Sequence, residues 1–241
     1  MVVNMHENER REQLRIQKVY AERERLMAAA KHTPKNPGNL SMQQERDSHL
    51  FSWLQRSGNF PLEDKKILDV GCGRGYALRN FVGRGARPEN LFGVDLIPMY
   101  VEEARRILPG AKLEVANGTK LSYPDESFDL VQQLTVFSSI LCEETRRKVA
   151  LEMLRVLKTG GHVIWYDFFL NNPWNPDVRG VGRREIYELF PHCDYYFERV
   201  TVVPPLARMI GQIIPQAYNP LSKLRVLSTH YIAYFRKLGS V

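Results

Sequence analysis

The residues most able to do chemistry in this 241-residue chain gather at one glycine-rich turn. Gly71, Gly73 and Gly75 occupy alternate positions, and Asp69 stands two residues before the first of them. Glycine lets the chain turn sharply and lets a ligand lie against bare backbone. A second acid, Asp95, ends an apolar run about 20 residues later, where a ribose-binding carboxylate is expected. The pattern therefore indicates a nucleoside site.

The glycine spacing distinguishes between kinds of nucleoside ligand. Dinucleotide sites carry G-x-G-x-x-G, which fits a pyrophosphate, whereas this chain carries G-x-G-x-G directly after an acid. A carboxylate suits a cationic amine and is poorly placed against a pyrophosphate. A nicotinamide oxidoreductase and an ordinary strand–turn–helix of another doubly wound protein stay open as alternatives. A binding titration that compares a nicotinamide dinucleotide with a cationic nucleoside distinguishes the oxidoreductase from the interpretation favoured here.

The run from Asp69 to Gly75 resembles the first motif of the class I S-adenosylmethionine-dependent methyltransferases. Three more stretches resemble that family in the same order, at 115–118, 123–131 and 155–167, so the resemblance covers roughly residues 66–168. The whole chain also resembles bacterial methyltransferases found with surface-sugar and specialised-metabolite pathways. The resemblance implies S-adenosylmethionine as the cofactor.

The resemblance also implies which residues hold that cofactor. Asp69 and the glycine turn meet the methionine end, Asp95 meets the ribose hydroxyls, and Leu96 packs on the adenine. The family often has an acid at the position of Asn117, and the amide oxygen of asparagine still accepts a hydrogen bond. The expected cofactor-binding residues are Asp69, Gly71, Cys72, Gly73, Gly75, Asp95, Leu96, Asn117, Gly118 and Gln133.

The acceptor side of the reaction carries weaker signals. Methyl transfer from a sulfonium is an in-line displacement, so the protein must mainly align the methyl donor with the acceptor and exclude water. A hydroxyl or ammonium acceptor also needs a group that takes up its proton. Relatives often show Glu-His where this chain has Ser138-Ser139. We therefore take Asp167 as the candidate general base and Tyr166 as a residue that lines the site. Alternatively, Asp167 caps the following loop and Tyr166 is a packing residue.

Four further residues are candidates for binding the substrate. Tyr20 is expected to fold over the cofactor from an N-terminal helix, unless it only anchors that helix. Asn171, Asn172 and Trp174 follow the fifth strand and are suited to orienting a polar or ring-bearing substrate. The alternative for the asparagines is a turn bonded to its own side chains. The six histidines are scattered and form no ligand pair, so no metal is expected.

Alternation of strands and helices indicates the elements that position these residues. Strands are predicted at 66–70, 91–95, 112–116, 128–133, 162–168, 196–203 and 229–236, and helices at 75–82, 98–107, 143–157 and 183–190. The fold class is therefore α/β, a Rossmann-like, doubly wound, seven-stranded and mostly parallel sheet, whose last two strands resemble an antiparallel closing pair. Ligands of such sheets bind at the carboxyl ends of the strands.

The flanking segments are expected to be helical. Residues 1–60 form an N-terminal cap, with a polar helix over 5–30, a loop over 31–40 and a second helix that starts from a capping box at Ser41. Residues 61–241 form the methyltransferase domain. A helical insertion lies at about 204–227, before the last strand, with apolar residues at helical spacing. It either covers the end of the sheet, or forms a lid over the substrate or a weak lipid-facing patch.

Composition limits the remaining classes of function. The net charge of +7 divides into +3 over residues 1–60, zero over 61–170 and +4 over 171–241, so it avoids the nucleoside site. Because acids are mixed with the bases and aromatics are not interleaved with them, nucleic acid is an unlikely substrate. Three well-separated cysteines favour a reducing compartment. No secretory signal or membrane span is expected, which favours the cytoplasm.

The sequence is thus interpreted as an enzyme that methylates a small molecule, at the oxygen of a sugar or specialised metabolite. Methylation at nitrogen or carbon, an RNA or protein acceptor, and a non-catalytic cofactor-binding scaffold remain alternatives. The chain lacks the Asn/Asp-Pro-Pro-aromatic motif of nitrogen methylation and reads Gln132-Gln133-Leu134-Thr135 instead. Monomer and homodimer are both open.

Overall fold

The computed structural model describes residues 2–29 and 36–239. Its seven strands are β1 (Ile67–Val70), β2 (Leu91–Asp95), β3 (Lys112–Val115), β4 (Phe128–Leu134), β5 (Leu157–Phe168), β6 (Cys193–Val202) and β7 (Ser228–Lys237). Its helices are α1 (Val2–Ala29), α2 (Pro37–Arg56), α3 (Tyr76–Val82), α4 (Pro98–Ile107), α5 (Glu143–Val156), α6 (Arg183–Leu189), α7 (Pro204–Ile213) and α8 (Tyr218–Ser222). Four short 3₁₀ turns are η1 (Pro88–Asn90), η2 (Phe137–Ser139), η3 (Pro215–Ala217) and η4 (Arg225–Leu227).

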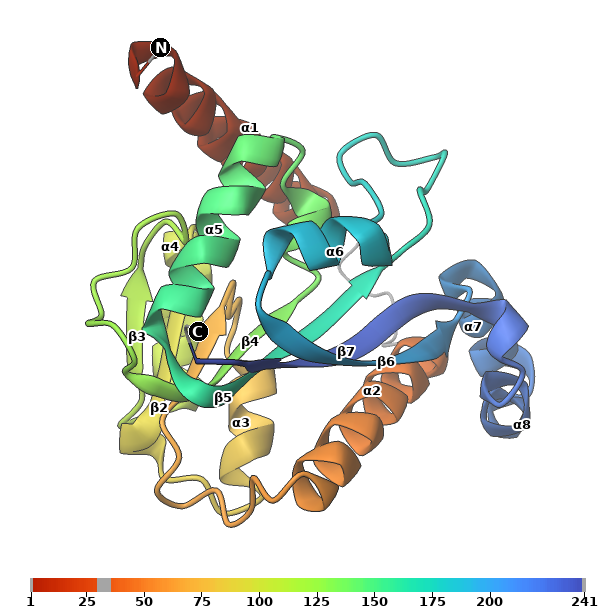
Figure 1. The fold of residues 1–241 in the computed structure, drawn as a ribbon. Coiled ribbons are helices and arrows are strands. Elements are labelled where there is room, and N and C mark those ends of the chain that lie inside the picture. Colours follow the sequence, from red (N-terminus) through yellow and green to blue (C-terminus); the bar gives the residue numbers. More distant parts are fainter. Residues whose placement is uncertain (1, 30–35, 240–241) are drawn as a thin grey trace.

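The strands form one sheet in the order β3-β2-β1-β4-β5-β7-β6 (Figure 1). Strands β1 to β5 are parallel to their neighbours, and β7 runs antiparallel between β5 and β6. The chain winds outward from β1 in one direction to β3 and in the other direction to β4 and β5. This reversal creates a crevice at the carboxyl ends of β1 and β4. The doubly wound fold class is confirmed.

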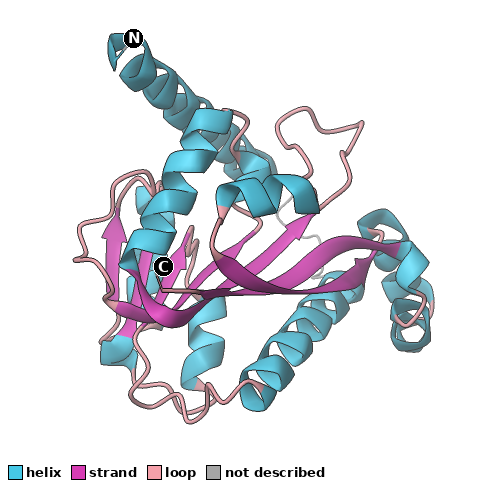
Figure 2. Ribbon diagram, in the orientation of Figure 1, coloured by secondary structure: helices cyan, strands magenta, loops and turns pink. Residues whose placement is uncertain are grey.

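Helices cover both faces of the sheet (Figure 2). Successive side chains of a strand point to opposite faces, so in β5 the buried Trp165 packs toward α5 and α6 while Ile164 packs toward α2 and α3. The second face includes Phe51 from α2 and Phe81 from α3, whose rings meet edge to face at 5.2 Å. Helix α2 therefore shares a hydrophobic core with the sheet.

The second helix starts earlier than its capping-box signal predicted. The side chain of Asn36 accepts a hydrogen bond from the Gly38 amide at 2.8 Å, and Pro37 occupies the first helical position. Asparagine caps a helix well, and the fixed φ of proline suits its first turn. Residues 37–40 are therefore helical and the predicted loop is wrong there. Its remaining part, with residue 30 of the first predicted helix, lies mostly outside the described residues.

Strand β5 is longer than its predicted span of 162–168 because it begins at Leu157. By residue type, the Gly160-Gly161 pair favours a turn before the strand. Gly160 instead takes φ +78° inside the strand, and the pairing with β4 shifts register between Phe128 and Leu130. A glycine at positive φ allows such an irregularity without ending the strand. Strand β6 likewise begins at Cys193 and not at Tyr196.

Two appended parts lie at the carboxyl edge of the sheet. Helix α1 passes beside α5, and the insertion of α7, η3, α8 and η4 lies at the end of the sheet far from β3 (Figure 1). Within residues 2–29 and 36–239, no helix is both long and apolar enough to cross a membrane.

Candidate functional site

A cavity of about 300 Å³ lies at the crevice that the topology creates. The carboxyl ends of four strands form its floor, with Val70 at the end of β1, Asp95 at the end of β2, Asn117 after β3 and Leu134 at the end of β4. Residues of α1 and α5 form its other walls. The expected residues that line it are Tyr20, Gly71, Gly73, Asp95, Leu96, Asn117 and Gly118.

The glycine turn forms one wall of the cavity. Gly71 has φ +77° and Gly73 has φ +51°, which is a region that side chains with a Cβ rarely adopt. A Cβ on Gly71 would lie 2.3 Å from the side chain of Val136, whereas a Cβ on Gly73 would meet nothing within 4 Å. Gly75 does not line the cavity and caps the start of α3 with φ +77°. The turn thus presents bare backbone beside open space.

Asp95 links the glycine turn to the next strand. Its Oδ2 accepts a hydrogen bond from the Gly73 amide at 2.8 Å, and its Oδ1 accepts one from the Ile97 amide at 2.9 Å. Burial raises the pKa of this carboxyl above its ordinary value, although the backbone bonds oppose that rise. Both oxygens keep further acceptor capacity, because a carboxylate offers about four acceptor positions.

Asp69 and Cys72 lie behind the cavity wall and not in it. Asp69 is fully buried, its Oδ1 has no hydrogen-bond partner, and burial raises its pKa to about 7. An unpartnered buried carboxylate oxygen is costly unless a ligand or ion satisfies it. The Cys72 side chain fills the space that a Cβ on Gly93 would occupy, at 2.9 Å, and burial raises the pKa of its thiol. Cys72 therefore packs as a neutral side chain.

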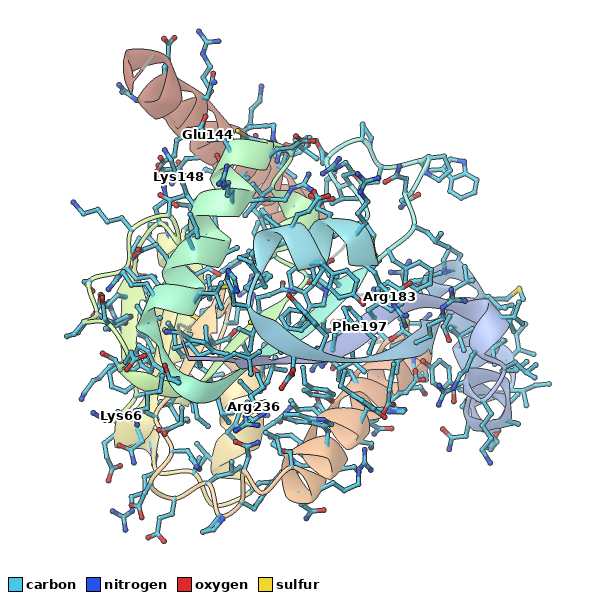
Figure 3. The ribbon with its side chains drawn as sticks, viewed as in Figure 1. Lys66, Glu144, Lys148, Arg183, Phe197 and Arg236 are labelled. Atoms are coloured by element: carbon cyan, nitrogen blue, oxygen red, sulfur yellow. The ribbon has the colours of Figure 1, made fainter. Side chains whose placement is uncertain are left out.

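Asn117 meets a carboxylate that the sequence analysis did not identify. Its Nδ2 donates to Oε1 of Glu9 in α1 at 3.1 Å, while its Oδ1 accepts from the Thr119 amide at 3.1 Å. Lys148 of α5 donates to Oε2 of Glu9 at 2.9 Å. Figure 3 shows Lys148 and Glu144 on the part of α5 beside α1. Glu9 lines the cavity, so α1 places a carboxylate next to the end of β3.

The loop after β4 is strained where it faces the cavity. Thr135 has φ +60°, and its amide donates to the carbonyl of Tyr166 at 2.7 Å. A β-branched residue at positive φ costs about 1–3 kcal/mol and persists only where its surroundings hold it. Gln133 supplies one such contact, since its Oε1 accepts from the Val136 amide at 2.9 Å. Gln133 is fully buried and braces this loop without lining the cavity.

Asp167 braces the same loop from the neighbouring strand. Its Oδ2 accepts from the Ser138 amide at 3.0 Å and its Oδ1 accepts from the Phe168 amide at 3.0 Å. The side chain is fully buried, it does not line the cavity, and burial raises its pKa to about 7. Tyr166 is also buried outside the cavity, with its hydroxyl 2.8 Å from Oγ1 of Thr201 and its ring stacked on His230.

The loop after β5 does not bring its candidate residues to the cavity. Trp174 is 86% exposed. The Asn172 side chain accepts from the Trp174 amide at 3.1 Å, and the Asn171 side chain accepts from the Gly180 amide at 2.9 Å. Both asparagines thus stabilise the loop backbone through their own side chains, which matches the alternative considered for them.

Tyr20 does reach the cavity, and it does so within a polar contact. Its hydroxyl lies 3.2 Å from Oγ of Ser139, which in turn lies 3.4 Å from the carbonyl oxygen of Thr135. Since Ser139 is able to donate to that carbonyl, its Oγ is free to accept from Tyr20. This pair therefore connects α1 to the strained loop after β4.

Helix α1 is fastened over the cavity at several points. Glu12 accepts hydrogen bonds from the Leu141 and Cys142 amides at the start of α5. Near the other end of α1, Glu24 pairs with Arg74 of the glycine turn at 2.6 Å and accepts from the Tyr100 hydroxyl at 2.7 Å. Sequence periodicity showed only a thin apolar stripe here, and the polar contacts join residues far apart in the chain.

These groups fit a cationic nucleoside better than a phosphate-bearing one. The cavity combines an unpartnered buried carboxylate oxygen at Asp69 behind its glycine wall with further carboxylates at Asp95 and Glu9. Such a set attracts an ammonium group and the hydroxyl and amino donors of a nucleoside, and repels a pyrophosphate. Among the described residues, no three His, Cys, Asp or Glu side chains group closely enough to hold a metal ion.

Comparison with known proteins agrees with this geometry. Residues 68–165 match the model of a methyltransferase domain family, and this range contains the glycine turn and both strands beside it. The matched residues form a class I methyltransferase domain, whose cofactor is S-adenosylmethionine. The family model ends within β5, so α1, α2 and the insertion lie outside the matched part of the methyltransferase.

Relatives of known name are similar over part of the chain. Phthiotriol/phenolphthiotriol dimycocerosates methyltransferase 1 of Mycobacterium ulcerans is 29% identical over 152 residues, which are 61% of this chain and 54% of the relative. The chain therefore spans about half the length of that relative. Ubiquinone biosynthesis O-methyltransferase of Pseudomonas fluorescens is 28% identical over 184 residues, which are 71% of this chain and 75% of the relative.

Solved structures show the same fold. The S-adenosylmethionine-dependent methyltransferase structure from Methanosarcina mazei aligns with a TM-score of 0.52 and 19% identity, covering 76% of this chain and 97% of the other. The fold thus agrees with that of this solved methyltransferase.

Proposed function

We propose that this methyltransferase transfers a methyl group from S-adenosylmethionine to an oxygen atom of a small molecule. The observation that carries the proposal is the cavity at the switch point, which bare glycine backbone and Asp95 line and which has the buried Asp69 carboxylate behind its glycine wall. Both named relatives are methyltransferases, and the name of one specifies transfer to oxygen. Residues 1–60 serve in this proposal as a cap on the domain formed by residues 61–241.

The cofactor roles follow the order of strands along the floor. The turn after β1 would hold the methionine end, with Asp69 attracting the ammonium group and Gly71 and Gly73 offering backbone. Asp95, the last residue of β2, would hold the ribose hydroxyls. Leu96, Gly118 and the Asn117–Glu9 pair would hold the base. In this proposal Glu9 supplies, from α1, a carboxylate acceptor for the amino group of adenine.

The protein contributes alignment and exclusion of water. The bound cofactor supplies an already activated methyl group, so these two effects carry most of the catalysis. Helix α1 closes the cavity through Glu12 and Glu24, and Gln133 and Asp167 hold the strained loop in place. Because both Asp167 oxygens already accept backbone hydrogen bonds, we assign it a positioning role in place of the general base expected from the sequence.

The acceptor hydroxyl meets the pair of Tyr20 and Ser139 in this proposal. With Tyr20 donating to Ser139 Oγ, a lone pair of the Tyr20 oxygen faces the cavity and accepts a hydrogen bond from the hydroxyl to be methylated. This contact orients the attacking oxygen toward the methyl donor. Within the described residues that line the cavity, the carboxylates lie at the ribose and base positions, so proton release goes to solvent.

Two measurements test the proposal. Calorimetry with S-adenosylhomocysteine and with NAD is expected to show binding of the former alone. Transfer of a tritiated methyl group is then followed to a panel of sugars, phenols and hydroxylated lipids, with an amine set and bulk RNA as comparison acceptors. Methylation of a hydroxyl compound supports the proposal. Preference for NAD, or methylation of RNA alone, contradicts it, and cofactor binding without any turnover favours a scaffold.

A further inference from the structure

Helix α7 turns its smallest residues toward the protein. Ala207 and Gly211 are buried against the start of α2. A Cβ on Gly211 would lie 2.1 Å from the Gly38 amide nitrogen, and a Cβ on Gly38 would lie 2.1 Å from the Ala207 carbonyl oxygen. The two helices therefore approach backbone to backbone, which only glycine permits.

The large apolar residues of the same helix face solvent. Met209 is 52% exposed and Ile213 is 70% exposed, and their four-residue spacing places them on one side of α7. Ile214, Leu224 and Val226 are exposed on the turns that follow, Val226 by 84%. These five residues, which we call the insertion surface, form an unusual concentration of exposed large side chains for a monomeric protein.

The charge of this segment is of one sign. Between residues 204 and 227 the sequence holds Arg208, Lys223 and Arg225 and no acidic residue. Two copies joined by a twofold axis would bring these cations against themselves, because such an interface uses the same patch twice. A segment with exposed apolar side chains, basic residues and no acid of its own instead fits the surface of a membrane that contains anionic lipids.

The position of α7 relates this surface to the cavity. Strand β6 runs parallel to β5, so α7 follows its carboxyl end at the same edge of the sheet where the cavity lies. In the strand order β6 is three positions from β4, a separation of about 15 Å at the usual strand spacing. A lipid surface against α7 would therefore lie at the carboxyl edge of the sheet, as the cavity does.

We propose that the insertion surface docks this methyltransferase reversibly on membranes rich in anionic lipid. The apolar side chains of α7 enter the interface between headgroups and acyl chains, and Arg208, Lys223 and Arg225 bind the lipid phosphates. This property goes beyond the methyl transfer proposed above and does not depend on it.

The test is flotation of the full chain with vesicles of phosphatidylcholine alone and of phosphatidylcholine with phosphatidylglycerol at 3:1. We expect at least tenfold stronger partition into the anionic vesicles, and loss of most of this preference in 0.5 M NaCl, where charges are screened. The double variant Met209→Ser/Ile213→Ser is expected to bind at least tenfold more weakly. The matched control is Leu151→Ser on α5, another exposed leucine at 49%, which leaves binding unchanged.

The measurement is decisive in both directions once circular dichroism shows that the variants are folded. Absence of wild-type flotation with anionic vesicles overturns the proposal, as does equal flotation of the wild type and the double variant. A dimer in light scattering that the double variant abolishes would assign the surface to a second copy instead. Because no cofactor or acceptor is present, none of these results bears on methyl transfer.

Discussion

At the scale of single residues, the role of each acid near the cavity follows from what its two oxygens already hold. Asp167 accepts a backbone amide on each oxygen and serves as a brace. Asp95 also accepts two amides but borders the cavity, so it both fixes the glycine turn and offers remaining lone pairs. Asp69 keeps one oxygen without a partner. Residue type alone does not distinguish these three states.

Asp95→Ala is expected to remove detectable binding of S-adenosylhomocysteine. The substitution loses the acceptor for the ribose and also releases the Gly73 amide that shapes the wall. Two hydrogen bonds to a charged group are each worth about 1.5–3 kcal/mol, which is enough to weaken binding at least 100-fold. Calorimetry measures it, with the exposed Asp125→Ala as control. An unchanged dissociation constant in Asp95→Ala would refute the ribose assignment.

Glu9→Gln tests whether the Glu9 carboxylate of α1 accepts a hydrogen bond from the amino group of adenine. The wild type should prefer S-adenosylhomocysteine to S-inosylhomocysteine, because inosine has no amino group to donate to the carboxylate. Loss of one charge-assisted hydrogen bond predicts a preference about tenfold smaller in the variant. Competition calorimetry gives the ratio, and Glu7→Gln on the same helix, whose partner is Arg11, is the control. If both variants keep the wild-type ratio while S-adenosylhomocysteine still binds, Glu9 does not contact the base.

At the scale of elements, polar contacts attach α1 to the sheet more than apolar packing does. The buried Glu12 accepts from two amides at the start of α5, where the helix dipole also favours a negative charge. Glu24 joins the opposite end of α1 to Arg74 and Tyr100. A helix held at its two ends by charged groups is able to open as one body when those contacts break.

Glu12→Gln should loosen α1 and accelerate dissociation of S-adenosylhomocysteine about tenfold. The neutral amide loses the charge-assisted part of the contacts to the Leu141 and Cys142 amides, a cost of about 1–2 kcal/mol. Stopped-flow fluorescence follows the dissociation. The control is Glu22→Gln, which changes an exposed pair with Arg25 on the same helix. Equal rates in the wild type and both variants would mean that α1 does not gate the cavity.

At the scale of the whole molecule, burial of charge couples stability to pH in two opposing ways. Burial raises the pKa of Asp69 and of Asp167 to about 7, whereas it lowers the pKa of His162 to about 4 and that of His230 to about 3. The acids bind more protons when folded, so their contribution to stability is lost as pH rises toward 7. The histidines bind fewer protons when folded, so theirs is lost as pH falls below about 6.5.

The two trends separate in single variants. Asp167→Asn removes a group that stabilises the fold when protonated, so its cost should be largest near pH 4.5 and shrink toward pH 7. His230→Gln should show the reverse, with the larger cost at pH 7. Urea unfolding at the two pH values gives the free energies. A cost of Asp167→Asn that grows from pH 4.5 to pH 7 would contradict the raised pKa.

Local patterns predicted the elements well where a signal lies within one element. The bounds of β2 and α4 match their predicted ranges, because the apolar periodicity of each is uninterrupted. Predictions were wrong where two local signals compete. The capping box at Ser41 competed with Asn36-Pro37 for the start of α2. Gly160-Gly161 signalled a turn, but these residues lie inside β5, between its paired positions Leu157 and His162.

The sequence by itself determined the fold class, because strand and helix periodicity are local properties, and its motifs carried the family resemblance that implies the cofactor. Tertiary structure alone decided which of the acids face the cavity and which only accept hydrogen bonds from backbone amides. Glu9 meets Asn117 across 108 positions of sequence, and Asp167 meets Ser138 across a strand boundary. Such contacts depend on how helices and strands pack, and periodicity within one element carries no information about its neighbour.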